Sequence, residues 1–351
     1  MASKGMAKHR KLIGDRIVEV AMASLLSRRR LLKTVFCSSA ALSLNLRPSI
    51  LEAAEGEDQH LFMIGDFGSM EPPQQAVANG MKGYIERLKV KPEWLMLLGD
   101  NFYKPMPGGL KSPRWKTGFE DMYPATVFPG PCPAVLGNHD YHDNAGGEQV
   151  QLAYAKQGGT RWTMPAKWYR QDLGSLVTFL FLDTNLRSVS GSSKNKDGKV
   201  VKKNSLTAEE EAAQWAWLKD ELAKPRAPFT IVAGHHPVYS NGQHGDTKEL
   251  VKTLAPMLQD SGVHLYLCGH DHDLQHLELE GLKTSFVLSG GGGARVRELK
   301  NTTRKMPFGT AVYGFSHLQI NPQRLIVRHL DANANQIHAF EKKLNHSWKT
   351  I

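Results

Sequence analysis

The sequence predicts an α/β fold, and two patterns in the order of its residues support this prediction. From about His60 onward, short apolar runs alternate with amphipathic stretches, which is typical of α/β architecture. After Leu274 the pattern changes to a two-residue alternation, which predicts antiparallel strands that close the domain. The apolar runs cover residues 61–64, 94–98, 134–136, 177–182, 229–233 and 263–267.

Five of these runs end directly in a glycine followed by a polar, metal-capable residue. Gly-Asp and Gly-Asn pairs are common turn formers, but turns alone do not explain five such endings. Because open α/β sheets bind ligands at the carboxyl ends of their strands, we expect these side chains to meet at one site. The endings are Gly65-Asp66, Gly99-Asp100, Gly137-Asn138, Gly234-His235 and Gly269-His270.

Residues 207–224 are expected to form a helix between two of the strands. Thr207 stands at the N-cap position and Glu210 follows three residues later, which is the pattern of a capping box. Trp215 and Leu218 would then pack against a sheet. The closing antiparallel strands are expected over residues 276–279, 316–320 and 325–329, with a turn at 321–322.

The first 54 residues are predicted to be a leader. They hold ten basic and three acidic side chains, a net charge of +7, which leaves only +3 of the total +10 for residues 55–351. Arginines 28–30 precede a modest apolar stretch, 34–46, that is too short to span a bilayer. This arrangement resembles a bacterial twin-arginine export signal, and an ordinary basic tail is the alternative. We expect the export machinery as a partner and a periplasmic or extracellular location.

Residues 55–351 are expected to form one domain and to act as a monomer. Their low net charge argues against a nucleic-acid partner. Cys132 and Cys268 are expected to be buried free thiols, although a disulfide between them stays open. No stretch after the leader is apolar over the length of a transmembrane helix, so no stable membrane insertion is expected.

The polar residues at the strand ends supply carboxylate, amide and imidazole groups, which suit first-row metal ions. A single catalytic metal uses about three protein ligands, so a larger set predicts two ions with a bridging carboxylate, for which Asp100 is the candidate. Two ions about 3.5–4 Å apart acidify a bound water and stabilise the entering and leaving oxygens of a phosphoester. The candidate ligands are Asp66, Asp100, Asn138, His235, His270 and His272.

Five motifs occur in the order and spacing of the metallophosphoesterase superfamily: GDFG (65–68), GDNFY (99–103), GNHD (137–140), AGHHP (233–237) and CGHDH (268–272). Each motif is weak alone, but the ordered set is specific. Over residues 61–290 they most resemble the purple acid phosphatases of the small, mammalian (tartrate-resistant) type. The resemblance implies a four-layer α/β/β/α sandwich of two mixed sheets flanked by helices. It also implies an acid phosphatase that hydrolyses phosphate monoesters by attack of a metal-bound hydroxide.

The resemblance further implies which residue binds which ion. Asp66, Tyr103 and His272 would bind an iron held as Fe(III), Asp100 would bridge, and Asn138, His235 and His270 would bind Fe(II), Zn(II) or Mn(II). Tyr103 discriminates between branches of the superfamily. Many related phosphodiesterases have Asp-x-His in the first motif with that histidine as a ligand, whereas here Gly68 takes its place. A phenolate favours Fe(III) and should give a visible charge-transfer colour, while an isolated tyrosine would merely pack.

Two further histidines match family positions that contact phosphate and assist the leaving group. His139 follows Asn138, and His244 lies nine residues after His235. A positioned histidine that protonates a departing oxygen contributes about 10²–10⁴-fold in rate. Activity is expected to favour mildly acidic pH, where these histidines are charged.

Two segments are expected to border the site. Residues 192–205 are polar, lysine-rich and without periodicity, which predicts an exposed mobile loop. In the mammalian-type enzymes a loop at this place restrains access, and a solvated insertion without function is the alternative. The SGGGG run at 289–293 lacks the Lys-Ser/Thr pair and the following helix of a phosphate-binding loop, so it predicts close backbone approach beneath the site.

Two rival functions remain. The first keeps the metals but changes the substrate, to a phosphodiester or a phosphoprotein, and Gly68 with Tyr103 argues against the phosphodiesterase branch. The second is a non-catalytic metal-binding or interaction protein on the same scaffold. Such a protein would be expected to have lost ligands, yet every expected ligand position is filled.

Overall fold

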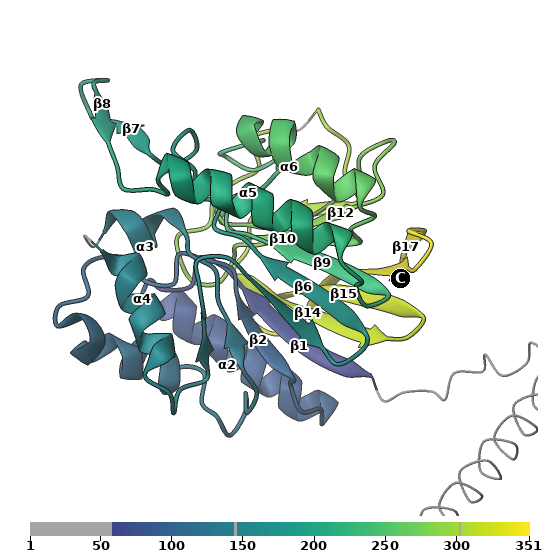
Figure 1. Cartoon of the computed structure of the whole chain (residues 1–351). Helices are drawn as coiled ribbons and strands as arrows, with labels where there is room; N and C mark the ends of the chain where they lie inside the picture. Colours follow the sequence, from purple (N-terminus) through teal and green to yellow (C-terminus); the bar gives the residue numbers. More distant parts are fainter. Residues whose placement is uncertain (1–57, 144–145, 302) are drawn as a thin grey trace, which may run out of the picture. The chain divides into compact units, whose positions relative to one another are not determined.

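Two mixed β-sheets pack face to face, and helices cover their outer faces (Figure 1). The computed structural model describes residues 58–143, 146–301 and 303–351. The four-layer α/β/β/α sandwich is confirmed. The leader predicted over residues 1–54 lies outside the described residues, so the export signal and the division into leader and domain stay predictions.

The first sheet has six strands, and its outer four confirm the predicted antiparallel end of the chain. Only β1 and β2 pair in parallel, and every other neighbouring pair is antiparallel. The order across the sheet is β17 (Trp348–Thr350), β16 (Gln336–Lys343), β15 (Arg324–Asp331), β14 (Gly314–Asn321), β1 (Gln59–Ile64) and β2 (Trp94–Leu97).

The second sheet has seven strands with a parallel centre. Its four middle strands run parallel, and antiparallel pairs close both sides. The order is β13 (Phe308–Thr310), β11 (Leu274–Leu277), β12 (Ser285–Ser289), β10 (Leu265–Cys268), β9 (Phe229–Ala233), β6 (Val177–Phe181) and β5 (Tyr169–Leu173).

Three apolar clusters fill the three interfaces between the four layers. One cluster lies between the sheets, and the others join the six-stranded sheet to α2 (Pro72–Leu88) and the seven-stranded sheet to α5 (Ala208–Ala223) and α6 (Lys248–Asp260) (Figure 1). Successive side chains of a strand point to opposite faces. Phe62 therefore packs toward α2 while its neighbour Met63 packs between the sheets. Continuous apolar runs result, because both faces of each sheet are buried.

The predicted helix is confirmed as α5. Thr207 caps its N-terminus, accepting a hydrogen bond from the backbone N–H of Glu210, whose side chain accepts one from the backbone N–H of Thr207. Leu218 is fully buried and Trp215 partly buried against the outer face of the seven-stranded sheet.

The prediction of a strand over residues 134–136 is wrong. This segment forms a single bridge, between Leu97 and Ala134, because its backbone donors turn to different partners. Val135 N–H donates to Leu97 O and Ala134 N–H to Thr163 O. Between β2 and β5 the chain instead forms short elements: a 3₁₀ turn (Gly109–Lys111), a π-helical turn (Lys116–Glu120), β3 (Cys132–Pro133), α3 (Asn138–His142), α4 (Gly147–Lys156) and β4 (Trp162–Thr163).

The lysine-rich segment 192–205 is exposed as predicted, but it is not an irregular loop. It forms a projecting two-stranded hairpin of β7 (Ser192–Lys194) and β8 (Val200–Lys202) (Figure 1). Its turn is fastened by the Asn195 side chain, whose Oδ1 accepts from Asp197 N–H and Lys199 N–H. An Asp-Gly pair before β-branched residues is a hairpin signal. Whether the hairpin restrains access to the site stays a prediction.

Cys132 and Cys268 are buried free thiols, which confirms that expectation. In the described part of the chain, no helix is long and apolar enough to cross a membrane.

His264 is one of several buried histidines that are expected to make stability depend on pH. The pKa of His264 is lowered from 6.5 to about 4, first by burial and then by the neighbouring His346. The unfolded chain takes up this proton as pH falls below 6.5, but the folded chain does not until about pH 4, so stability is lost over that window. Between pH 7 and pH 5 the free energy of unfolding of His264→Asn should therefore fall less than that of the native protein, by up to about 2 kcal/mol. Urea unfolding of both proteins at the two pH values measures this, and parallel pH profiles would contradict it.

Candidate active site

Asp66, Tyr103 and His272 form the first of two clusters of predicted ligands. Tyr103 Oη lies 3.2 Å from both Asp66 Oδ1 and His272 Nε2. His272 Nε2 is 3.5 Å from Asp66 Oδ1. Asp66 and His272 are buried, and Tyr103 is partly buried. The side chains that the resemblance assigns to the Fe(III) ion are therefore brought together.

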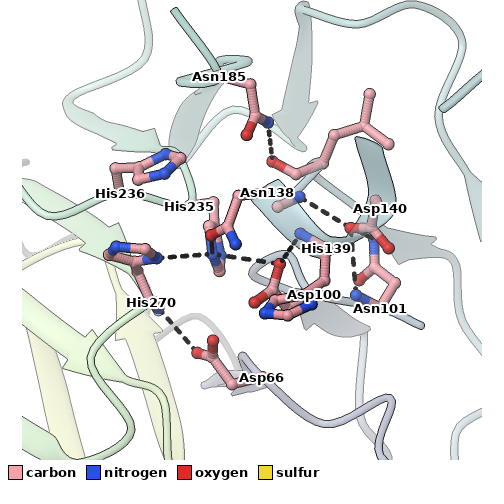
Figure 2. Close-up of polar contacts among 12 residues, drawn as sticks. Asp66, Asp100, Asn101, Asn138, His139, Asp140, Asn185, His235, His236 and His270 are labelled. Carbon is pink, nitrogen blue, oxygen red and sulfur yellow. Dashed lines mark hydrogen bonds and ion pairs between the residues drawn. The ribbon is translucent and has the colours of Figure 1, made fainter. Parts of the chain in front are cut away.

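Asn138, His235 and His270 form the second cluster. His235 Nε2 lies 3.3 Å from Asn138 Oδ1 and 3.3 Å from His270 Nδ1, and Figure 2 shows the three side chains converging. His235 follows β9 and His270 follows β10, two neighbouring parallel strands. The side chains assigned to the second ion thus also lie together.

Asp100 lies where the two clusters meet. Its Oδ1 is 3.4 Å from His235 Nε2 in the second cluster. Ligand atoms of Asp100, Asp66 and His272 all lie within 4.8 Å of one another, and all three residues are buried. Asp100 accordingly has the position that a bridging carboxylate needs.

Three of these residues share a backbone conformation that is uncommon outside glycine. Asp66, Asp100 and His270 have φ values of 57°, 51° and 70°. Each stands two or three residues after the end of its strand, immediately after a glycine. The left-handed turn directs each side chain into the site, and backbone strain of this kind gathers at functional sites.

Backbone carbonyls fix the tautomers of two imidazoles. His235 Nδ1 contacts Leu98 O at 2.9 Å, and His272 Nδ1 contacts Arg295 O at 2.8 Å. Because a carbonyl oxygen only accepts, each Nδ1 carries the hydrogen and donates it, which leaves the Nε2 lone pair facing the site. This arrangement orients the imidazoles of metal-binding histidines.

Asp140 supports the site, although sequence reasoning assigned it no role. Its Oδ2 accepts hydrogen bonds from Gly137 N–H at 2.8 Å and Asn101 N–H at 3.2 Å, and its Oδ1 accepts from Phe102 N–H at 3.1 Å. Asp140 therefore joins the turn after β2 to the turn that carries Asn138 (Figure 2). Its position as the last residue of the GNHD motif could have identified it in the sequence.

Thr184 is a second supporting residue that the sequence did not reveal. Its Oγ1 accepts hydrogen bonds from the backbone N–H groups of His235, at 3.2 Å, and His236, at 2.9 Å. The run 177–182 ends in polar residues, as the five others do, but without a glycine. That ending was the signal that could have identified it.

Opposing effects set the protonation of the first cluster. Burial alone would raise the pKa of Asp66, yet this pKa is lowered because the neighbouring His272 and His235 favour the charged carboxylate. The pKa of Tyr103 is raised well above its usual value, first by burial and then by the charges of Asp100 and Asp66. Without a cation, Tyr103 is therefore a neutral phenol.

His139 and His244 lie beside different clusters. The His139 ring is 4.4 Å from the Tyr103 ring, and its backbone N–H donates to Asp100 Oδ1 at 2.8 Å. The His244 ring is 4.2 Å from the His270 ring. Both predicted proton donors thus lie at the site, and each of them contacts at least one predicted ligand.

The glycine run is confirmed as a place of close backbone approach. A Cβ atom on Gly290 would lie 2.0 Å from Asp271 O, within the turn between His270 and His272. Gly290 N–H donates to Asp273 O at 3.0 Å. The run therefore packs directly under the residues of CGHDH.

The donor set fits two bound cations. Asp66 and Asp100 are buried, and among the described residues neither forms an ion pair with lysine or arginine. Buried carboxylates without a cationic partner are costly, and a metal ion supplies the missing charge. Carboxylate, phenol, amide oxygen and imidazole together suit first-row ions rather than Mg²⁺ or Ca²⁺.

The sequence matches the calcineurin-like phosphoesterases over residues 60–274. The chain belongs to this family. It is 31% identical to mouse tartrate-resistant acid phosphatase type 5, over 78% of this chain and 87% of that protein. It is 29% identical to purple acid phosphatase 7 of Arabidopsis thaliana, over 87% of this chain and 92% of that protein. Family membership and the buried group of Asp66, Asp100 and His272 identify the chain as a dinuclear-metal phosphoesterase.

Solved structures share the fold of this phosphoesterase. A purple acid phosphatase from yellow lupin seeds superposes with a TM-score of 0.61 at 18% identity, over 82% of this chain and 54% of that one. GAP50, described as the anchor in the inner membrane complex of Plasmodium, superposes with a TM-score of 0.66 at 24% identity, over 80% and 87%. At these identities the likeness concerns the fold alone.

Proposed function

We propose that the protein is an acid phosphatase that hydrolyses phosphate monoesters at a two-metal site. The observation that carries this proposal is the pair of ligand clusters with Asp100 between them. One ion would be held by Asp66, Tyr103, His272 and Asp100, and the other by Asn138, His235, His270 and Asp100. When bound, the ions supply the positive charge that acidifies a water and neutralises the phosphoryl oxygens.

The leaving oxygen takes its proton from His139 or His244. The pKa of His139 is raised to about 9: burial opposes the charge, but the hydrogen bond with Asp143 and the charge of Asp100 outweigh it. The pKa of His244 is lowered, first by burial. His139 therefore keeps its proton at neutral pH, whereas His244 gains one only in acid. His139 is charged at mildly acidic pH, and the charged fraction of His244 rises as the pH falls, which supports an acidic optimum.

Purified protein tests the proposal directly. Hydrolysis of an aryl phosphate, metal analysis near two ions per chain, and a violet absorption band are the expected results. If the protein is active but colourless and free of iron, it belongs to another branch of the superfamily. A protein that binds the metals and hydrolyses no phosphoester would contradict the acid phosphatase proposal.

Tyr103 is proposed to bind Fe(III), and its removal should abolish the colour. Tyr103→Phe in the iron-loaded protein is expected to lose the visible band, because the band needs a phenolate on the metal. Tyr123→Phe is the matched control, since Tyr123 is a buried tyrosine outside both ligand clusters. Absorption spectra of both variants at equal iron content measure this. A band that survives in Tyr103→Phe would show that another group gives the colour.

The rival functions have weaker support. A phosphodiesterase of the usual Asp-x-His type would need a histidine where Gly68 lies. A non-catalytic scaffold is suggested by the fold likeness to the Plasmodium anchor. It would not need two complete ligand clusters or two histidines beside them. The identity of the second ion, among Fe(II), Zn(II) and Mn(II), is left to metal analysis.

Export is proposed on the leader sequence. Arginines 28–30 before a weakly apolar stretch support a twin-arginine route to the periplasm or beyond. Such a route suits a protein that loads its metals before it leaves the cytoplasm. Replacing the three arginines with lysines and finding the enzyme still exported would contradict it. A monomer is proposed, and light scattering of the purified protein tests it.

A further inference from the structure

A pocket of about 1080 Å³ is lined by His244 and by a cationic segment. We call residues 294–305 the cationic arm. The arm carries five basic residues and one acidic residue, a net charge of +4, although residues 55–351 together carry only +3. Three of these basic residues line the pocket: Arg295, Arg297 and Lys300.

Hydrogen bonds to the ligand clusters fix the start of the arm. Ala294 N–H donates to Asp66 O at 2.8 Å, and Arg297 N–H donates to His272 O at 3.2 Å. In return, His272 Nδ1–H donates to Arg295 O at 2.8 Å. The two arginines are therefore held at the edge of the candidate active site.

Asn241 anchors the far end of the arm. Its backbone carbonyl accepts from the N–H groups of Lys300, at 2.9 Å, and Asn301, at 3.0 Å. Its side-chain amide donates to Arg304 O at 2.9 Å. Asn241 is buried and lies three residues before His244, so the arm and this histidine share one support.

The three cations that line the pocket lack anionic partners. Among the residues that the structure describes, Arg295, Arg297 and Lys300 form no ion pair, whereas Arg304 pairs with Asp246. Arg297 Nη1 lies 2.6 Å from His244 Nε2 and donates to it. Glu298 also lines the pocket, so its lining carries two more positive than negative side chains. The three cations repel one another unless an anion is bound.

We propose that Arg295, Arg297 and Lys300 form a second anion subsite, which binds a phosphoryl group carried by the leaving group of the substrate. This proposal rests on the proposed phosphatase function. Guanidinium groups bind phosphate through paired, charge-assisted hydrogen bonds. The pocket volume of about 1080 Å³ is slightly above the usual range for small-molecule sites, so a small ligand has room there. The substrate class is therefore a small ester or anhydride with at least two phosphoryl groups.

The subsite is compatible with the balance of the reaction. Water adds to the terminal phosphorus, the bond from that phosphorus to the leaving oxygen breaks, and inorganic phosphate is released. The leaving group keeps its second phosphoryl group on the arm, and its oxygen takes a proton from His139, or from a protonated His244 once Arg297 donates to the bound phosphoryl group instead of to His244 Nε2. Because Arg297 contacts His244, a second phosphoryl group bonded close to the leaving oxygen would be within reach of the arm.

Substrate selectivity tests the subsite. ADP has a second phosphoryl group on its leaving oxygen, whereas phenyl phosphate has none. In the metal-loaded double variant Arg295→Gln/Lys300→Gln, kcat/KM for ADP should fall roughly 10-fold or more beyond any fall for phenyl phosphate. Lys305→Gln is the matched control, since Lys305 lies in the same arm but does not line the pocket. Its ratio of the two kcat/KM values should equal that of the native protein.

Calorimetry of methylenediphosphonate binding gives a readout without turnover. The double variant should bind it roughly 10-fold more weakly than the native protein, with little change for inorganic phosphate. An unchanged ADP to phenyl phosphate ratio with unchanged diphosphonate binding would overturn the subsite. So would a selective loss on an acidic phosphopeptide with ADP unaffected, which would assign the arm to protein substrates. A native protein inactive on both small substrates would contradict the phosphatase function, and calorimetry would still decide the subsite.

Discussion

Asp100→Asn is expected to lower phosphatase activity by about 10³-fold or more while the fold is retained. Asp100 is the carboxylate within reach of both ligand clusters. Its loss removes the one negative charge that both proposed ions would share, and a loss of about 4 kcal/mol of stabilisation corresponds to this factor. Asparagine keeps the oxygen that accepts the hydrogen bond from His139 N–H. The kcat/KM for an aryl phosphate and the metal content of the variant measure the effect.

Stability separates this effect from unfolding. Asp100 and Asp66 are buried near each other without lysine or arginine partners in the described part of the chain. Removing one of these two charges should leave the metal-free variant at least as stable as the metal-free native protein. Asp121→Asn makes the same change at an exposed aspartate and should keep full activity. An active Asp100→Asn protein with two ions per chain would show that the bridging assignment is wrong.

The ligand clusters could be predicted because local sequence and topology agree there. Parallel strands align their carboxyl ends, so residues that follow β1, β2, β9 and β10 must meet at one edge of the packed sheets. A glycine followed by a polar residue marks each of these ends in the sequence. The resemblance to the purple acid phosphatases then assigned the residues to two sets, and the geometry brings the members of each set together.

The supporting roles of Asp140 and Thr184 were missed, because their partners are backbone groups that lie far away in the sequence. Asp140 binds the N–H groups of Asn101 and Phe102, which lie nearly 40 residues away, and Thr184 binds the N–H groups of His235 and His236. Their side chains carry no periodic signal. The hairpin over 192–205 was missed for another reason: with both faces exposed, its strands lack the apolar alternation that marks a strand.

Gly68→Ala is expected to cost about 3 kcal/mol of stability and most of the activity. A Cβ atom at this position would lie 2.0 Å from Asn101 O and 2.5 Å from Phe102 N. These are backbone atoms, so no change of rotamer relieves the overlap, and the two loops must separate. Gly68 N–H donates to Asp100 O at 3.2 Å, and Tyr103 N–H donates to Gly68 O at 3.0 Å. Separation would break both hydrogen bonds and move Asp100 and Tyr103 together.

Gly83→Ala is the matched control for this substitution. Gly83 lies in α2, and a Cβ atom there would meet nothing within 4 Å. Alanine should stabilise that helix by roughly 0.5–1 kcal/mol. Urea unfolding and aryl phosphate hydrolysis of both variants measure the contrast. A Gly68→Ala protein with native stability and activity would show that the two loops separate at little cost.

The same contact explains why Gly68 and Tyr103 occur together. In this structure a histidine at position 68 cannot be accommodated without moving the backbone of residues 101–102. That backbone leads directly to Tyr103, whose hydroxyl completes the first ligand cluster. Gly68→His should therefore lose the tyrosine contact rather than add an imidazole ligand. Iron-loaded Gly68→His should be colourless as well as inactive, and a coloured, active variant would show that position 68 does not control the placement of Tyr103.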